Sequence, residues 1–281
     1  MTTLASPRRR RLSLADKLGL VGLVIVVAMV LVAVFAPMLA PYDPAERVGI
    51  PFSPPSSEHP LGTNDVGQDL LSELIFGARV SLTVGIVAAI VALLIGTAVG
   101  VLAGYYPKRI GSVLMRLVDV VLILPFLPLL IVLAAYLGRS LTNTILVIAV
   151  LSWAAPARII RSQVLSLRSR EYVLASRSIG APDRWIVFRH ILPRTGLLAT
   201  GSFVRAISGA ILLEAALSFL GLGDPIQKSW GSILFWAQSR GAFLTPAWKW
   251  WVLPPGLAIM LASLGFALIA FAVEERINPK L

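Results

Sequence analysis

The residues that most suggest a site lie in the interval 158–194, which carries eight arginines. Apolar residues recur there at helical spacing, which a simple linker between two membrane spans would not require. These residues are Val164, Leu167, Tyr172, Ala175 and Ile179. An amphipathic helix of this kind does no covalent chemistry. It either docks onto another protein or lies on lipid, and the pattern leaves both interpretations open.

The turn signals in this interval predict where its helices begin and end. Gly180 is expected to end one short helix, residues 182–183 to begin another, and Pro193 to end that second helix. Small side chains near the end of the first helix would let a second protein approach closely. These small residues are Ala175, Ser176 and Gly180.

Two ionisable residues lie within apolar stretches long enough to cross a membrane, and such residues are functional candidates by default. Arg205 and Glu214 are nine positions apart, so at 3.6 residues per turn they point to opposite faces and should not pair. Together with Ser218 they are our candidates for a transport pathway or gate. Glu214 would contact a substrate, brace an outer gate or make a structural hydrogen bond between helices.

A second charged pair, Arg116 and Asp119, lies three residues apart near the end of a predicted span. This spacing places both side chains on one helix face, so we expect a local ion pair. A role of the pair in transport is the alternative.

The sequence offers little for catalysis. It has no cysteine and only two histidines, His59 and His190, both outside the predicted spans. No phosphate-binding G-x-x-x-x-G-K-[ST] motif occurs. We therefore predict no catalytic residues, no metal site and no bound cofactor. An intramembrane protease would need a paired catalytic set, which is not apparent, and a secondary transporter would need a carboxylate relay, for which only Asp119 and Glu214 are available.

The composition predicts a bundle of membrane helices. The chain has 281 residues, of which 57% are hydrophobic and only 14% charged, and its mean hydropathy is +0.84. Soluble domains are typically about 25% charged. A span needs about 20 apolar residues, and six intervals qualify: 18–42, 80–107, 120–138, 140–157, 195–223 and 250–273.

The arginine and lysine distribution predicts the orientation of these spans. With the N-terminus in the cytoplasm, the inside segments carry 18 basic residues and the outside segments carry five. This bias follows the positive-inside rule, so both termini should be cytoplasmic. It also accounts for the net charge of +11 without a nucleic-acid partner.

Two further patterns concern packing. Gly96, Gly100 and Gly104 form consecutive small-xxx-small steps, which predict close contact with another helix. Five of the seven tryptophans fall between 230 and 251. They indicate an outer loop that folds back on the membrane surface, either as an aromatic belt or as a docking surface for an outside partner.

The arginine-rich interval resembles a known element. E-Y-V-L-A-S-R-S-I-G (171–180), followed after nine residues by H-I-L-P (190–193), resembles the cytoplasmic EAA loop of ATP-binding-cassette (ABC) importer permeases. In that family the loop forms a coupling helix that inserts into the ATPase subunit. Ala175 and Ser176 stand where the family often has two alanines, and the serine is a mild departure. The resemblance implies these coupling residues: Glu171, Ala175, Ser176, Arg177, Gly180, Ile191 and Pro193.

Other segments narrow the resemblance to the C-subunit type of the dipeptide/oligopeptide permeases. They are H-P-L-G-T-N-D-V-G-Q-D-L-L-S-E-L-I-F-G-A-R-V-S-L (59–82), E-A-A-L-S-F-L-G-L-G (214–223) and S-W-G (229–231). The last helix departs, because family members commonly end it with Gly-Asp and Arg-Asp pairs. Some relatives carry oligosaccharides or nickel, so this departure leaves the cargo open.

The resemblance implies an all-α membrane protein with six transmembrane helices and the type I ABC importer permease fold. It implies a bacterial or archaeal inner-membrane location and import of di- or oligopeptides. The implied partners are a second homologous permease, two ABC ATPase subunits that bind ATP and Mg, an extracytoplasmic solute-binding protein and membrane lipid.

The expected organisation has a basic cytoplasmic start, a first transmembrane helix, an extracytoplasmic segment, a five-helix core and a short cytoplasmic tail. The core contains a cytoplasmic coupling loop and an extracytoplasmic loop. The boundaries are 1–17, 18–40, 41–78, 79–274 and 275–281, with the two loops at 158–194 and 221–249.

Overall fold

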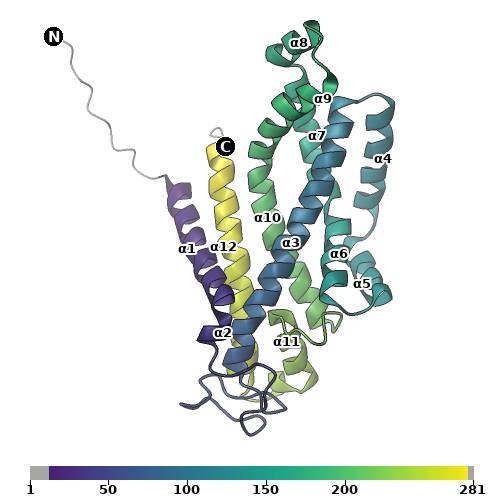
Figure 1. Cartoon of the computed structure of the whole chain (residues 1–281). Coiled ribbons are helices and arrows are strands. Elements are labelled where there is room, and N and C mark those ends of the chain that lie inside the picture. The colour runs from purple at the N-terminus through teal and green to yellow at the C-terminus, as the bar shows by residue number, and fades with distance from the viewer. Residues whose placement is uncertain (1–12, 278–281) are drawn as a thin grey trace, which may run out of the picture.

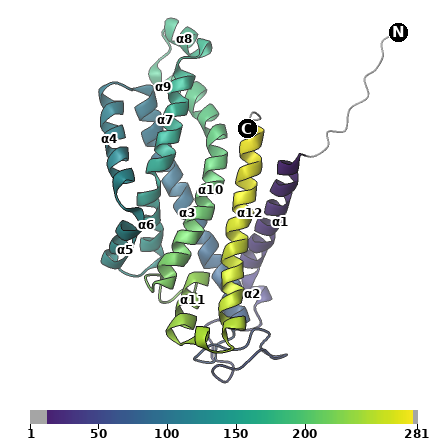
Figure 2. The same cartoon turned by 180° about the vertical axis from the view of Figure 1, so that it is seen from behind.

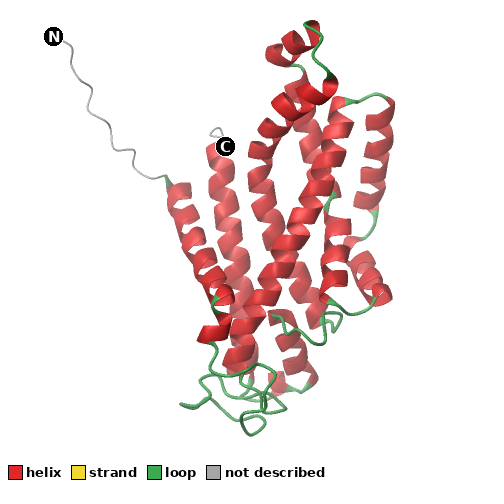
Figure 3. Cartoon of the chain, in the orientation of Figure 1, coloured by secondary structure: helices red, strands yellow, loops and turns green. Residues whose placement is uncertain are grey.

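The computed structural model describes residues 13–277, apart from the side chains at 197 and 198. Most of the expected basic start (1–17) and the end of the expected tail (275–281) lie outside the described residues. The described part is helical (Figures 1 and 3). Its helices are α1 (Leu14–Val34), α2 (Ala36–Leu39), α3 (Leu70–Tyr105), α4 (Arg109–Ile123), α5 (Phe126–Leu137), α6 (Leu141–Ser152), α7 (Ala154–Arg168), α8 (Glu171–Ser178), α9 (Asp183–Ile186), α10 (Leu192–Phe219), α11 (Trp230–Ser239) and α12 (Leu253–Ile277).

Four helical stretches are long and apolar enough to cross a membrane: 14–34, 70–105, 199–219 and 248–276. Two further spans form if each bent helix pair counts as one, namely α4 with α5 and α6 with α7. On that count the six predicted spans are all present. The third differs from the expected 120–138, because α4 and α5 meet at 89°. Pro125 explains the break, since proline disfavours helical backbone in the residue before it.

Helix α3 is the centre of the bundle. It packs against α7, α10, α6 and α1, and Figure 2 shows α7 and α10 covering it from behind. Its remaining face stays exposed along the helix, at Arg79, Thr83, Ile90, Leu94 and Leu102. In Figure 1, α3 lies between α1 and α4.

The two ends of the bundle are built differently. The start of α1, the end of α12 and the α8–α9 segment lie at one end, here called the α8 end (Figure 1). Segment 40–69 and α11 lie at the opposite end, the α11 end. Two of the five clustered tryptophans, Trp230 and Trp251, are buried there, with 2% and 1% of their surfaces exposed. These two rings belong to the core, whereas Trp236 and Trp248 are part-exposed as a surface belt would be.

The glycine stripe of α3 lies against α7, as predicted from its spacing. A Cβ atom at Gly100 would lie 2.7 Å from the carbonyl oxygen of Ala157 and 2.9 Å from the Ile160 side chain. A Cβ at Gly96 or Gly104 would likewise meet α7 atoms. The two helix backbones therefore approach too closely for any larger residue.

We expect Gly100→Ala to lower the free energy of unfolding by about 1–3 kcal/mol, because overpacking displaces helix backbone. The matched control is Gly209→Ala in α10, where a Cβ would meet nothing within 4 Å. That change should be neutral or stabilising by up to about 1 kcal/mol. Unfolding in detergent micelles measures both, and equal effects of the two changes would contradict the close contact.

Candidate functional site

Helix α8 stands at the tip of the α8 end, beyond the membrane-length helices (Figure 1). Glu171 lies in its first turn and Arg177 in its last, which suits the helix dipole. Val173 and Ser176 face inward and are buried, whereas Leu174 and Ala175 face outward. The helix therefore has an anchored face and an outer face that no other part of residues 13–277 covers.

The candidate coupling residues divide between these faces. Glu171, Ala175, Arg177 and Gly180 are exposed, whereas Ser176 is buried. The Ser176 hydroxyl donates to the Tyr172 carbonyl oxygen at 2.7 Å and lies 3.3 Å from Nε2 of His190. Through its contact with His190, Ser176 therefore anchors α8 to the segment that follows α9.

The other two predicted residues lie after α9. Ile191 is fully buried and ends a π-helical segment, Val187–Ile191. Pro193 is in the first turn of α10, so the expectation that it ends a helix is wrong. The helical backbone is continuous from α9 through this π-helical segment into α10, and the wider π turn accommodates a residue that cannot donate a backbone hydrogen bond.

Gly180 follows α8 and has a φ of +81°, in the left-handed region that favours glycine. A Cβ at this position would meet nothing within 4 Å. Within this chain, Gly180 is required by the backbone conformation rather than by a close approach.

A hydrogen-bonded cluster ties α8 and α9 to the end of α3. The Tyr105 hydroxyl donates to Asp183 Oδ1 at 2.6 Å, and the Tyr106 hydroxyl donates to Oδ2 at 3.1 Å. Arg177 donates to the Tyr105 hydroxyl oxygen at 3.2 Å. The hydrogen bond from Tyr105 holds the pKa of the Asp183 carboxyl below its ordinary value, so Asp183 is ionised at neutral pH.

This cluster was missed from the sequence, where Asp183 appeared only as a helix start. Tyr105 and Asp183 are 78 positions apart, and only the packing of the helices brings them together. The tyrosine pair at the end of a predicted span was the one available signal.

Glu214 lies in a buried polar cluster at the junction of α3, α10 and α11. It is 2% exposed and accepts hydrogen bonds from Ser81 at 2.9 Å and Ser218 at 2.7 Å. Ser81 in turn accepts a hydrogen bond from the backbone N–H of Trp230. The structure thus places two of the three gate candidates, Glu214 and Ser218, in one interhelical cluster.

We expect Ser218→Ala to lower the free energy of unfolding by about 1–3 kcal/mol, because a buried carboxylate oxygen loses a donor. Ser178→Ala is the matched control, since that hydroxyl is exposed and donates to a carbonyl oxygen of its own helix. It should change stability by less than about 0.5 kcal/mol. If both variants unfold like the parent in detergent, the Glu214 cluster is not a stabilising element.

Arg205 lies apart from this cluster, as the spacing predicted. It pairs with Glu274 of α12, and the two side chains are 63% and 37% exposed. The expected pairing of Arg116 with Asp119 is not what the structure shows. Asp119 bonds instead to Arg158 of α7 at 2.5 Å, because α4 packs against α7 and a partner on the facing helix is within reach.

The α11 end holds a second buried cluster that the sequence did not reveal. Glu73 is 2% exposed and accepts hydrogen bonds from Lys228 and from Asn64, the latter at 2.6 Å. Lys228 also donates to the amide oxygen of Gln68. These contacts fasten the loop before α11 to the start of α3.

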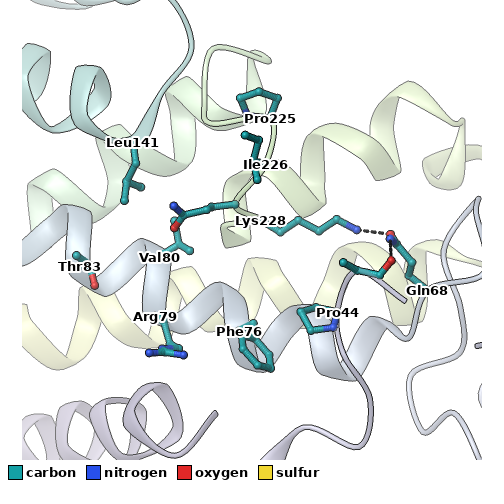
Figure 4. A pocket seen from close by; sticks show the side chains of 12 residues that line it. Pro44, Gln68, Phe76, Arg79, Val80, Thr83, Leu141, Pro225, Ile226 and Lys228 are labelled. Carbon is teal, nitrogen blue, oxygen red and sulfur yellow. Dashed lines mark hydrogen bonds between the residues drawn. The ribbon is translucent and has the colours of Figure 1, made fainter. Parts of the chain in front are cut away.

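A cavity of about 620 Å³ opens beside this cluster (Figure 4). Helix α3 lines it at Phe76, Arg79 and Thr83, and the loop before α11 lines it at Ile226 and Lys228. Across residues 13–277, no three His, Asp or Glu side chains gather as a metal site would require.

The described residues form a helical protein with several candidate membrane spans, and comparisons with known proteins identify its family. Residues 96–281 match the family model of the binding-protein-dependent transport system inner membrane component. Residues 9–58 match the N-terminal TM domain of oligopeptide transport permease C. The chain therefore belongs to the ABC importer permeases of the dipeptide/oligopeptide family, C-subunit type, and is an inner-membrane protein.

Individual relatives are similar over most of their length. The dipeptide transport system permease protein DppC of Alkalihalophilus pseudofirmus is 38% identical over 95% of this chain and 87% of the relative. The di/tripeptide permease protein DppC of Pseudomonas aeruginosa is 39% identical over 95% and 89%. The oligopeptide permease protein OppC of Bacillus subtilis is 35% identical over 95% and 87%.

Proposed function

We propose that this chain is the transmembrane permease subunit of an ATP-driven importer of di- and oligopeptides. The observation that carries the proposal is its similarity, over 95% of its length, to permeases named for dipeptide, di/tripeptide and oligopeptide transport. The chain forms half of the translocation pathway, and a second homologous permease faces the open side of α3.

Two ABC ATPase subunits bind at the α8 end and supply ATP hydrolysis, with ATP and Mg bound only by those subunits. The α8 end is cytoplasmic, and the excess of arginine and lysine in its loops supports this orientation. Both termini are then cytoplasmic. The segments 41–78 and 221–249 are extracytoplasmic and form the surface that receives a loaded solute-binding protein.

The outer face of α8 is the coupling surface. Transmission of a domain motion needs a rigid element, and α8 is held by the Ser176–His190 contact and by the Tyr105–Asp183 cluster. Exposed ion pairs contribute about 0–1 kcal/mol each. Glu171 and Arg177 therefore add little, and the shape around Ala175 dominates the fit to the ATPase.

Uptake by the complete complex in proteoliposomes tests the cargo. With ATP inside and loaded binding protein outside, we expect accumulation of a labelled di- or tripeptide. Accumulation of an oligosaccharide or a nickel complex instead of the peptide would show that the proposed cargo is wrong. It would still support an ATP-driven importer. Uptake driven by a proton or sodium gradient without ATP would overturn the importer itself.

A further inference from the structure

The cavity beside α3 has an unbalanced charge. Its lining includes two cationic side chains, Arg79 and Lys228, and no carboxylate. The Lys228 ammonium is already paired with the buried Glu73 carboxylate. The Arg79 guanidinium carbon lies 6.0 Å from the centroid of the Phe76 ring. Among the described residues, no acidic side chain lies within ion-pair distance of Arg79.

The position of Arg79 on α3 relates its charge to the cavity. Arg79 lies near the α11 end of α3, one residue before the predicted span that begins at 80. It heads the open face of α3, on which Thr83, Val87, Ile90 and Leu94 follow toward the α8 end. The cavity therefore lies at the α11 end of this exposed face.

A guanidinium on the wall of a partly enclosed cavity suits one kind of ligand particularly well. Its planar fork donates two parallel hydrogen bonds to a carboxylate. Every linear peptide has a terminal carboxylate whatever its side chains are. Gln227 and Thr83 also line the cavity, and their amide and hydroxyl groups can both donate and accept hydrogen bonds.

We infer that Arg79 is a binding residue for the terminal carboxylate of a peptide that enters the cavity at the α11 end. The inference rests on the proposed function and deepens it, because it assigns the substrate group that the outer mouth recognises. Such a contact recognises the terminal carboxylate that all linear peptides share. It does not discriminate between peptide side chains.

The test compares two probes in proteoliposomes of the complete complex, alanyl-alanine and alanyl-alaninamide. Both are supplied at concentrations that saturate the binding protein, as followed by its ligand-induced fluorescence change. The variants are Arg79→Gln, Arg79→Lys and the control Arg139→Gln. Arg139 is exposed between α5 and α6 and does not line the cavity. The binding protein can prefer one probe over the other, but it delivers each probe equally to the parent and to the variants. This preference therefore cancels when parent and variant uptake of the same probe are compared as a ratio.

We expect Arg79→Gln to lower uptake of alanyl-alanine about tenfold and to change uptake of the amide less than twofold. Arg79→Lys should retain more uptake than Arg79→Gln, and Arg139→Gln should behave as the parent. Equal loss for both probes would overturn the inference and assign Arg79 to an ion pair with the second permease. A loss confined to vesicles with anionic lipid would assign it to a lipid headgroup.

An unchanged uptake of both probes by Arg79→Gln would also overturn the inference, while leaving the proposed function in place. Failure of the parent complex to import alanyl-alanine or any other peptide is a different result, and it would reject the proposed function itself.

Discussion

Lys228→Met is expected to lower the free energy of unfolding by about 3–5 kcal/mol, the cost of leaving a buried charge without its partner. Glu73 is 2% exposed and is held by Lys228 and Asn64. Removal of the Lys228 ammonium leaves the buried Glu73 carboxylate without its charged partner. It also removes the contact that ties the loop before α11 to α3. Titration with a denaturing detergent in mixed micelles measures the change.

Two controls separate the ion pair from a general effect of losing a lysine. Lys249 is exposed at the same end of the molecule, so Lys249→Met should change stability by less than about 0.5 kcal/mol. The double variant Lys228→Met with Glu73→Gln should recover much of the loss, because no uncompensated charge then remains. If the double variant is as unstable as the two single changes combined, Lys228 and Glu73 are not coupled.

Ala175→Trp is expected to lower ATP hydrolysis stimulated by loaded binding protein at least tenfold, together with uptake. Ala175 is exposed on the outer face of α8, so an indole there should leave this chain folded and obstruct the fit to an ATPase. Gly180 is a poorer place for the same test. Its φ of +81° means that any side chain strains the chain itself.

The matched change for Ala175→Trp is Ser112→Trp. Ser112 is also exposed near the α8 end, but it lies on α4 rather than α8. We expect its stimulated ATPase activity to stay within twofold of the parent. Normal stimulation by Ala175→Trp, in a complex that contains all its subunits, would remove α8 from the transmission path.

Local patterns in the sequence predicted much of this architecture. The apolar periodicity and Gly180 placed α8 within two residues of its observed end at Ser178. The glycine spacing predicted the α3–α7 contact, because a stripe of small residues has a period that matches one helix face. Both signals lie within about four turns of one helix, where sequence spacing translates directly into geometry.

The remaining features depend on tertiary contacts. Lys228 and Glu73 are 155 positions apart, and nothing near either residue specifies the other. Arg116 and Asp119 have a spacing that favours a local ion pair, yet Asp119 pairs with Arg158 of α7 instead. Pro193 carried a stop signal that is equally a first-turn signal, and the structure alone decides between the two.

Crosslinking to the ATPase tests the central claim most directly. The chain has no cysteine, so Ala175→Cys introduces its only thiol. With a maleimide–benzophenone reagent, which attaches to this thiol and photocrosslinks to C–H bonds of a neighbouring protein, we expect Ala175→Cys to crosslink to an ATPase subunit in the assembled complex, whereas Ser112→Cys does not. Crosslinking from neither site, or equally from both, would contradict the account, because α8 would then not be the element that contacts the ATPase.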